Sequence, residues 1–126
     1  MPHGRAILLV DDEDTIRSTS ARVLKRDGFT VFTAASAEEA GEIWGRESGS
    51  IGVLVTDVEL GGMDGVTLAA RCLEERPGLP VVLTSGYAAD ELRARRPVPD
   101  GCRFLAKPFT AIELLDLVRP LLEPAR

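Results

Sequence analysis

The chain has 126 residues, of which 44% are hydrophobic and 28% are charged, and its formal net charge at pH 7 is −5. This length is typical of one domain with one core, so we expect residues 1–126 to form a single domain. The acidic balance argues against direct binding to nucleic acid, whose phosphates attract a basic surface. The sequence contains no apolar run long enough to cross a bilayer and no signal-peptide core. We therefore expect no membrane insertion and a cytoplasmic location.

Five apolar segments of strand length alternate with segments of helical periodicity. This alternation is typical of a parallel sheet with helices on its faces. The apolar segments show little polar alternation, which indicates strands buried on both faces. The expected strands are Ala6–Asp11, Thr30–Ala34, Ile51–Asp57, Val81–Ser85 and Arg103–Ala106.

Between the expected strands, apolar residues recur three and four positions apart, as on the buried face of a helix. Two helix starts carry capping boxes, Ser36-x-x-Glu39 and Thr110-x-x-Glu113, in which side chains bind amides that the first turn leaves unpaired. The buried stripes are expected at Ile16, Ser20, Val23 and Leu24; Ala40, Ile43 and Trp44; Val66, Ala69, Ala70 and Leu73; and Leu114, Leu117, Val118 and Leu121.

The helix after Ser85 has the weakest pattern. Ala89 and Leu92 give it a thin apolar stripe, and Pro97 and Pro99 stop it early. We expect this helix to be short and loosely held.

The two cysteines, Cys72 and Cys102, lie far apart in the sequence and form no C-x-x-C motif. His3 is the one histidine, so the chain has too few sulfur and imidazole ligands for a zinc site. We expect two reduced thiols packed in the core.

Polar side chains follow the expected strands at their carboxyl ends, where ligands gather in an open parallel sheet. Three carboxylates, a hydroxyl and an ammonium should therefore meet at one edge. They come from Asp11 and Asp12 after the first strand, Asp57 at the end of the third, Thr84–Ser85 at the end of the fourth and Lys107 after the fifth.

Such a cluster calls for a cation. Two carboxylates ~4 Å apart repel by roughly 4 kcal/mol at an effective dielectric constant near 20, so three together need neutralisation. An oxygen-rich site suits Mg²⁺, which keeps several waters and accepts phosphate oxygens. One carboxylate can then attack phosphorus while the lysine and the hydroxyl bind other phosphoryl oxygens. The residues predict aspartyl phosphorylation.

Five motifs at consecutive strand ends resemble response-regulator receiver domains of two-component signalling, and they cover nearly the whole chain in the right order. The resemblance implies an α/β, flavodoxin-like, doubly wound fold in which a five-stranded parallel sheet of order 2-1-3-4-5 is flanked by five helices. A stand-alone regulator, part of a longer regulator and the receiver module of a hybrid histidine kinase are all compatible with it. The motifs are ILLVDDE at 7–13, Asp57, MDG at 63–65, VVLTSGYA at 81–88 and FLAKPF at 104–109.

The resemblance also implies a set of metal ligands. Asp11 and Asp12 would hold Mg²⁺, together with the carboxylate of Asp57 and the backbone carbonyl of Glu59. Asp57 would be the phosphoacceptor.

The resemblance assigns the remaining site residues to the phosphoryl group. Lys107 would pair with the incoming group, and Ser85, rather than Thr84, would move toward it once it is bound. Phe104 would change rotamer in step, and the peptide bond between Lys107 and Pro108 would be cis, well above the ~5–6% base rate for such bonds.

Three positions depart from the common receiver pattern. Gly61 stands where a proline is usual, which frees the backbone of the loop after Asp57. Glu59 adds an acidic side chain near the site, and Tyr87 adds an aromatic ring beside its mouth. We hypothesise that Glu59 and Tyr87 tune the lifetime of the aspartyl phosphate.

The resulting prediction is a phosphoacceptor signalling switch rather than an enzyme. Its partner would be a histidine kinase or a histidine phosphotransfer protein of a phosphorelay. The face made by the helix after Ser85, the strand Arg103–Ala106 and the last helix would report phosphorylation to an output domain or a second copy of the chain.

Two alternatives stay open. One is a Mg²⁺-dependent aspartate-nucleophile phosphohydrolase, although such enzymes carry D-x-D on their opening strand, whereas Asp57-Val58-Glu59 follows the third strand here. The other is a receiver-like interaction module that is never phosphorylated.

Overall fold

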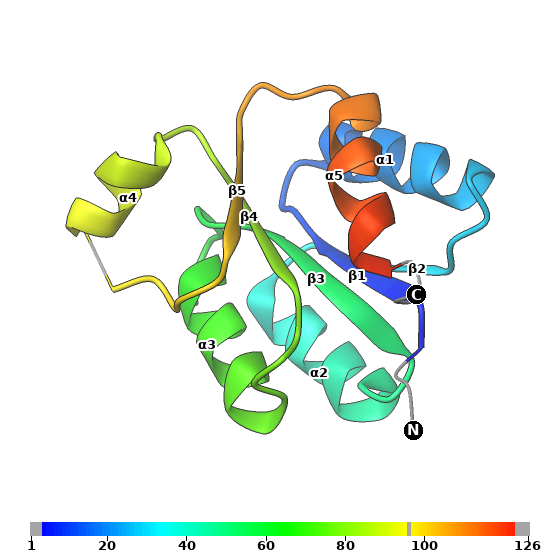
Figure 1. Cartoon of the computed structure of the whole chain (residues 1–126), viewed down its shortest axis with the longest axis horizontal. Coiled ribbons are helices and arrows are strands. Elements are labelled where there is room, and N and C mark those ends of the chain that lie inside the picture. The colour runs from blue at the N-terminus through cyan, green and yellow to red at the C-terminus, as the bar shows by residue number, and fades with distance from the viewer. Residues whose placement is uncertain (1–3, 96, 123–126) are drawn as a thin grey trace.

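The computed structural model describes residues 4–95 and 97–122, so His3 lies outside the described residues. Five parallel strands form one sheet in the order β2-β1-β3-β4-β5, which confirms the predicted topology (Figure 1). The strands are β1 (Ala6–Val10), β2 (Val31–Ala34), β3 (Ile51–Asp57), β4 (Val81–Ser85) and β5 (Arg103–Ala106).

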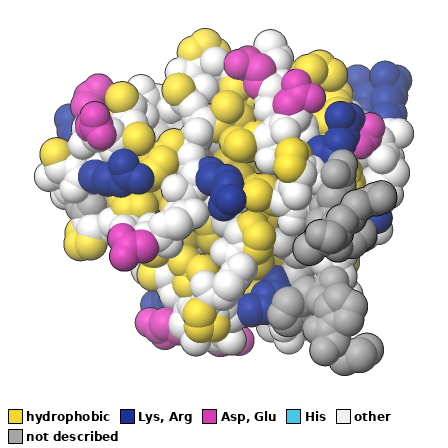
Figure 2. Space-filling model, viewed as in Figure 1, with side chains coloured by type: hydrophobic (Ala, Val, Ile, Leu, Met, Phe, Trp, Pro, Cys, Tyr) yellow, Lys and Arg dark blue, Asp and Glu magenta, His cyan; other side chains and the backbone are white. Residues whose placement is uncertain are grey.

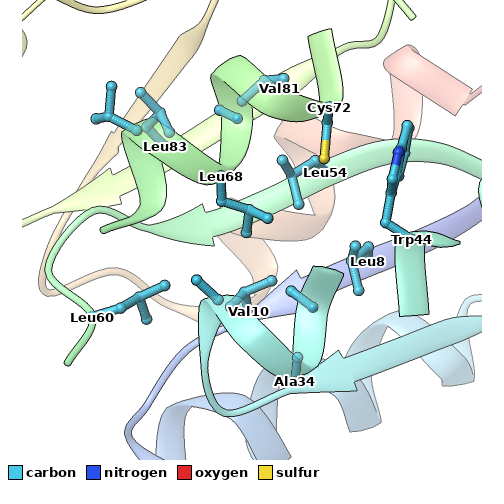
Figure 3. Close-up of a cluster of buried hydrophobic side chains, with 14 of the residues drawn as sticks. Leu8, Val10, Ala34, Trp44, Leu54, Leu60, Leu68, Cys72, Val81 and Leu83 are labelled. Carbon is cyan, nitrogen blue, oxygen red and sulfur yellow. The ribbon is translucent and has the colours of Figure 1, made fainter. Parts of the chain in front are cut away.

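Helices alternate with the strands and cover both faces of the sheet. Residues of α1 and α5 and one face of the sheet form one hydrophobic cluster (Figure 1). Residues of α2, α3 and α4 and the other face of the sheet form a second cluster, part of which Figure 3 shows. Within the described ranges, no helix is long and apolar enough to cross a membrane. The helices are α1 (Asp14–Arg26), α2 (Ala37–Glu47), α3 (Gly65–Glu75), α4 (Ala89–Arg95) and α5 (Ala111–Leu122).

The inner strands are buried on both faces, as their continuous apolar sequences predict. Every residue of β1 and β4 is buried, and so is every residue of β3 except Gly52. The two outer strands differ, because each has only one neighbour in the sheet. Arg103 and Ala106 of β5 are exposed, so the expectation of full burial is wrong for this strand.

Two strand boundaries shift by one residue from those predicted. β1 ends at Val10, because the Asp11 side chain accepts a hydrogen bond from the backbone N–H of Glu13 and turns the chain toward α1. β2 begins at Val31, one residue after the predicted start at Thr30.

The capping box of α5 forms in full, and that of α2 forms in part. The Thr110 hydroxyl accepts from the N–H of Glu113 at 3.0 Å, and the Glu113 carboxylate accepts from the N–H of Thr110 at 2.8 Å. At α2 the Ser36 hydroxyl accepts from the N–H of Glu39 at 3.1 Å. The Glu39 carboxylate reaches one residue further than predicted and accepts from the N–H of Ala35 at 2.6 Å.

Helix α4 is short and lightly anchored, as predicted. Its one buried side chain is that of Leu92. Two exposed arginines add aromatic contacts, because the Arg93 guanidinium lies 4.7 Å from the ring centre of Phe104 and the Arg95 guanidinium lies 4.3 Å from that of Tyr87. Figure 2 shows hydrophobic side chains exposed between charged ones on the face of the molecule that includes α4 and β5.

Cys72 and Cys102 are both buried and form no disulfide, in agreement with the prediction of packed thiols. Burial raises the pKa of the Cys72 thiol to about 12 and raises the pKa of the Cys102 thiol as well. Neither thiol is poised as a nucleophile at neutral pH, because the thiolate is the reactive form.

Candidate functional site

Three carboxylates converge at the carboxyl ends of β1 and β3. Asp11, Asp12 and Asp57 each offer one carboxylate oxygen, and these oxygens lie within 4.8 Å of one another. Asp11 and Asp57 are buried, with 2% and 3% of their surface exposed, whereas Asp12 is open to solvent. The structure thus brings together the three aspartates that the strand-end pattern selected.

Lys107, which directly follows β5, places its ammonium among these carboxylates. Its Nζ lies 2.8 Å from Oδ2 of Asp57 and 3.2 Å from Oδ2 of Asp11. Oε1 of Glu13 lies 3.7 Å away, a contact that sequence reasoning did not predict. The backbone N–H of Lys107 donates to the carbonyl of Ser85 at 2.8 Å, which anchors the backbone from which this side chain extends. The peptide bond between Lys107 and Pro108 is cis, as expected.

Asp57 is held by the loop that follows it. Its Oδ1 accepts from the backbone N–H of Glu59 at 3.1 Å, while Oδ2 accepts from Lys107. Gly65, the first residue of α3, packs against the Asp57 carbonyl so closely that an added Cβ would lie 2.0 Å from that oxygen. This close approach explains why glycine ends the Met63-Asp64-Gly65 motif.

Ser85 contacts the side chain of Glu59. The Ser85 hydroxyl lies 3.3 and 3.4 Å from the two carboxylate oxygens of Glu59, and its oxygen accepts from the N–H of Tyr87 at 3.0 Å. The Glu59 carboxylate therefore lies at Ser85, and it is not one of the three carboxylates that cluster closely enough to hold one ion. Sequence reasoning placed Glu59 near the site but missed this contact.

Burial and neighbouring charges shift the pKa values of Asp57 and Lys107. Burial raises the pKa of Asp57 to about 6, although the hydrogen bond and charge of Lys107 oppose this shift. Burial by itself would lower the pKa of the Lys107 ammonium, but Asp57 and Asp11 outweigh it and the net direction is upward. Lys107 therefore stays protonated at neutral pH, and it favours the ionised form of Asp57.

The donor set fits a hard divalent cation. Three carboxylates against one ammonium leave a formal excess of two negative charges. Ligands of one octahedral Mg²⁺ lie roughly 3 Å apart when adjacent and about 4.2 Å apart when opposite, so aspartate oxygens within 4.8 Å of one another must draw closer to share an ion. Carboxylate oxygens are also the ligands that Mg²⁺ prefers over softer donors.

We expect Asp57→Asn to be more stable than wild type at about pH 7.5 without metal, and equally stable near pH 4. The folded-state pKa of Asp57 lies above the ordinary value of 3.8, so its stability contribution is full below that pH and is lost as pH rises through about 6. The shift corresponds to at most about 3 kcal/mol, and asparagine cannot ionise. Urea unfolding in EDTA across this pH range measures the difference.

Mg²⁺ provides the control for that experiment. The ion should stabilise wild type more than Asp57→Asn, because the variant has lost one of the clustered carboxylates. A difference in stability between wild type and Asp57→Asn that stays constant from pH 4 to 7.5 would contradict the raised pKa.

Known proteins resemble the chain in sequence and in structure. The family model of the response regulator receiver domain matches residues 7–119. The sensor kinase CckA of Brucella abortus (strain 2308) is 38% identical over 117 residues, which are 93% of this chain and 12% of that kinase. The response regulator receiver protein CpdR of the same strain is 30% identical over 118 residues, which are 94% of this chain and 97% of CpdR.

A crystal structure of the receiver domain from the hybrid histidine kinase CckA superposes with a TM-score of 0.78 at 36% identity. The superposition covers 94% of this chain and 99% of that one. Fold and strand-end motifs therefore agree with one family along nearly the whole described chain.

Proposed function

The chain belongs to the response regulator receiver family of two-component signalling, and on that premise we propose that it is a switch that is phosphorylated on Asp57 in a Mg²⁺-dependent reaction. The observation that carries the proposal is the position of Asp57, whose carboxylate is buried, bound by Lys107 and clustered with Asp11 and Asp12. The phosphoryl donor is a phosphohistidine on a histidine kinase or a histidine phosphotransfer protein. We propose that residues 1–126 act as one receiver domain.

In the proposed reaction, a carboxylate oxygen of Asp57 attacks phosphorus, an O–P bond forms, and the P–N bond of the phosphohistidine breaks. The imidazole leaves and takes up a proton from water. Lys107 lies close enough to Asp57 to pair with an oxygen of the transferred group. Asp11, Asp12 and Asp57 would hold Mg²⁺, with the backbone carbonyl of Glu59 as a fourth ligand, and the bound ion would neutralise charge on the phosphoryl oxygens.

The phosphoryl group would carry a charge of roughly −1.5 to −2, by analogy with other phosphorylated side chains, in place of the single charge of the Asp57 carboxylate. Such a change shifts an existing equilibrium between two conformations of the chain. The response is expected on the face made by α4, β5 and α5, because α4 has one buried side chain and mobile elements come from the least stable parts of a fold. An output domain or a second copy of the chain would bind this face.

Intact-mass spectrometry after incubation with acetyl phosphate and Mg²⁺ tests the proposal. We expect one phosphoryl adduct on wild type, no adduct on Asp57→Asn, and a strong reduction when EDTA replaces Mg²⁺. No adduct on wild type, or an equal adduct on Asp57→Asn, would instead support an interaction module that is not phosphorylated.

The same samples test the phosphohydrolase alternative. A phosphoacceptor takes one equivalent of phosphoryl group and loses it slowly, whereas an aspartate-nucleophile hydrolase releases many equivalents of phosphate from a generic ester such as p-nitrophenyl phosphate. Sustained turnover that disappears in Asp57→Asn would overturn the proposed switch.

A further inference from the structure

Glu59 connects the two residues that a phosphoryl group on Asp57 would bridge. Its backbone N–H donates to Oδ1 of Asp57 at 3.1 Å, and both of its carboxylate oxygens lie within hydrogen-bonding distance of the Ser85 hydroxyl. Ser85 is 2% exposed, whereas Glu59 is open to solvent. One side of Glu59 therefore fixes the phosphoacceptor, and the other side meets the hydroxyl that is expected to bind the phosphoryl group.

The Ser85 hydroxyl already has both a donor and an acceptor. A serine hydroxyl has a single proton to donate. Its oxygen accepts from the N–H of Tyr87 at 3.0 Å, so the hydroxyl proton is directed to the carboxylate of Glu59. An oxygen of a phosphoryl group would be a second anionic acceptor for that one proton.

From this geometry we propose that Glu59 is a positioning residue that restrains phosphorylation, because its carboxylate takes the place of the phosphoryl group as the anionic partner of Ser85. The inference rests on the proposed function and adds a means of regulating the same site. Phosphorylation of Asp57 then requires Ser85 to exchange its hydrogen bond from Glu59 to the phosphoryl group.

The only covalent change is the transfer of the phosphoryl group, and Ser85 changes only its hydrogen-bond acceptor. With acetyl phosphate as donor, an Asp57 oxygen attacks phosphorus, the bond between phosphorus and the acetyl oxygen breaks, and acetate leaves. Ser85 keeps its proton and donates it to a phosphoryl oxygen in place of a Glu59 oxygen. The Glu59 carboxylate is then hydrated, because Glu59 is exposed to solvent.

A double-mutant cycle separates this mechanism from simple charge repulsion. We expect Glu59→Ala to accelerate phosphorylation by acetyl phosphate about tenfold, which is the low end for a hydrogen bond to a charged group, since 3.3 and 3.4 Å are long contacts. In a Ser85→Ala background the same change should have no effect on the rate. Intact-mass time courses with saturating Mg²⁺ give the four rates.

Two further variants control for charge. Glu59→Gln keeps an acceptor oxygen without the charge and should retain about half of the restraint, because a neutral hydrogen bond is roughly half as strong as a charged one. Glu42→Ala removes a remote exposed carboxylate of α2 and should leave the rate unchanged. Equal acceleration by Glu59→Ala with and without Ser85, or equal rates for Glu59→Gln and Glu59→Ala, would overturn the proposal in favour of repulsion. No acceleration by Glu59→Ala would overturn it outright.

The amide proton of Tyr87 gives a readout that needs neither Mg²⁺ nor phosphate. A hydroxyl that donates to a carboxylate is a stronger acceptor, because hydrogen bonds in a chain polarise one another. Glu59→Ala should therefore move the Tyr87 amide proton upfield in the NMR spectrum and speed its exchange, and should change neither in a Ser85→Ala background. If Glu59→Ala leaves both the chemical shift and the exchange rate of the Tyr87 amide proton unchanged, the proposed restraint is contradicted.

The two proposals fail in different ways. Absence of any adduct on wild type removes the proposed function, and the Tyr87 amide then decides whether Glu59 holds Ser85. An adduct on Asp57 with additive effects of Glu59→Ala and Ser85→Ala removes only the further inference.

Discussion

Gly65→Ala should lower the free energy of unfolding by about 3 kcal/mol, the upper part of the usual range for an overpacked site. The new Cβ would lie 2.0 Å from the carbonyl oxygen of Asp57 and 2.9 Å from both the Asp57 carbonyl carbon and Oγ1 of Thr56. Backbone atoms cannot rotate away as the end of a side chain can. Helix propensity alone predicts the opposite result, because alanine is favoured over glycine by about 1 kcal/mol within a helix. Urea unfolding measures which effect dominates.

Gly61→Ala is the matched control, because Gly61 lies in the loop that leads to α3 and an added Cβ there would meet nothing within 4 Å. Its backbone is not in the left-handed region that favours glycine. We expect this variant to be neutral or more stable by up to about 1 kcal/mol, through loss of freedom in the unfolded chain. If Gly65→Ala has the same free energy of unfolding as Gly61→Ala, α3 does not pack against Asp57 as closely as described.

Gly65→Ala also tests the site, since the clash is with the phosphoacceptor itself. The structure must move either α3 or the end of β3, and a shift of β3 carries the Asp57 carboxylate away from Lys107. We therefore expect slower phosphorylation of the folded fraction of this variant than of Gly61→Ala.

The type and succession of the elements were predictable because the inner strands are continuous apolar runs and the helix starts carry specific capping residues, whereas the strand order came from the resemblance to receiver domains. The predictions for β3, β4 and β5 match the observed bounds. The capping boxes at Ser36 and Thr110 mark helix starts that the structure confirms. These signals are local, so tertiary contacts were not needed to read them.

Helix α3 shows where periodicity was insufficient. Its predicted stripe contained Ala70 and Leu73, which are only half-buried, and it missed Leu68 and Cys72, which are buried. Apolar residues lie on several sides of this helix, so spacing alone does not single out one face. The neighbouring α2 and the sheet decide which side is buried.

The site was predictable as far as the strand ends determine it. Parallel strands end at one edge, so Asp11 and Asp57, which end the adjacent strands β1 and β3, were expected to be neighbours. Lys107 follows β5, two strands away from β3, and its long side chain spans that distance. The contact between Glu59 and Ser85 depends on the rotamers of two side chains 26 positions apart, one in the loop after β3 and one at the end of β4. No sequence spacing encodes such a contact.

We expect Lys107→Met to slow phosphorylation by acetyl phosphate about 10²- to 10³-fold, the usual effect of losing one preorganised donor to transition-state charge. Methionine keeps the length of the side chain but removes the ammonium that lies 2.8 Å from Oδ2 of Asp57. The Mg²⁺-free variant should also lose about 3 kcal/mol of stability, because the buried carboxyl groups of Asp57 and Asp11 lose the positive charge that offsets their burial. Intact-mass time courses and urea unfolding measure the two effects.

Mg²⁺ separates the two roles of Lys107. The ion replaces the missing positive charge among the carboxylates, so it should restore most of the stability of Lys107→Met and bind this variant more tightly than wild type in calorimetry. The ion should not restore the rate, because the donor to the phosphoryl oxygen is still absent. Lys107→Arg keeps the charge in a larger, planar group and should recover stability more fully than rate. Phosphorylation of Lys107→Met at the wild-type rate would show that Lys107 serves only to neutralise the aspartates.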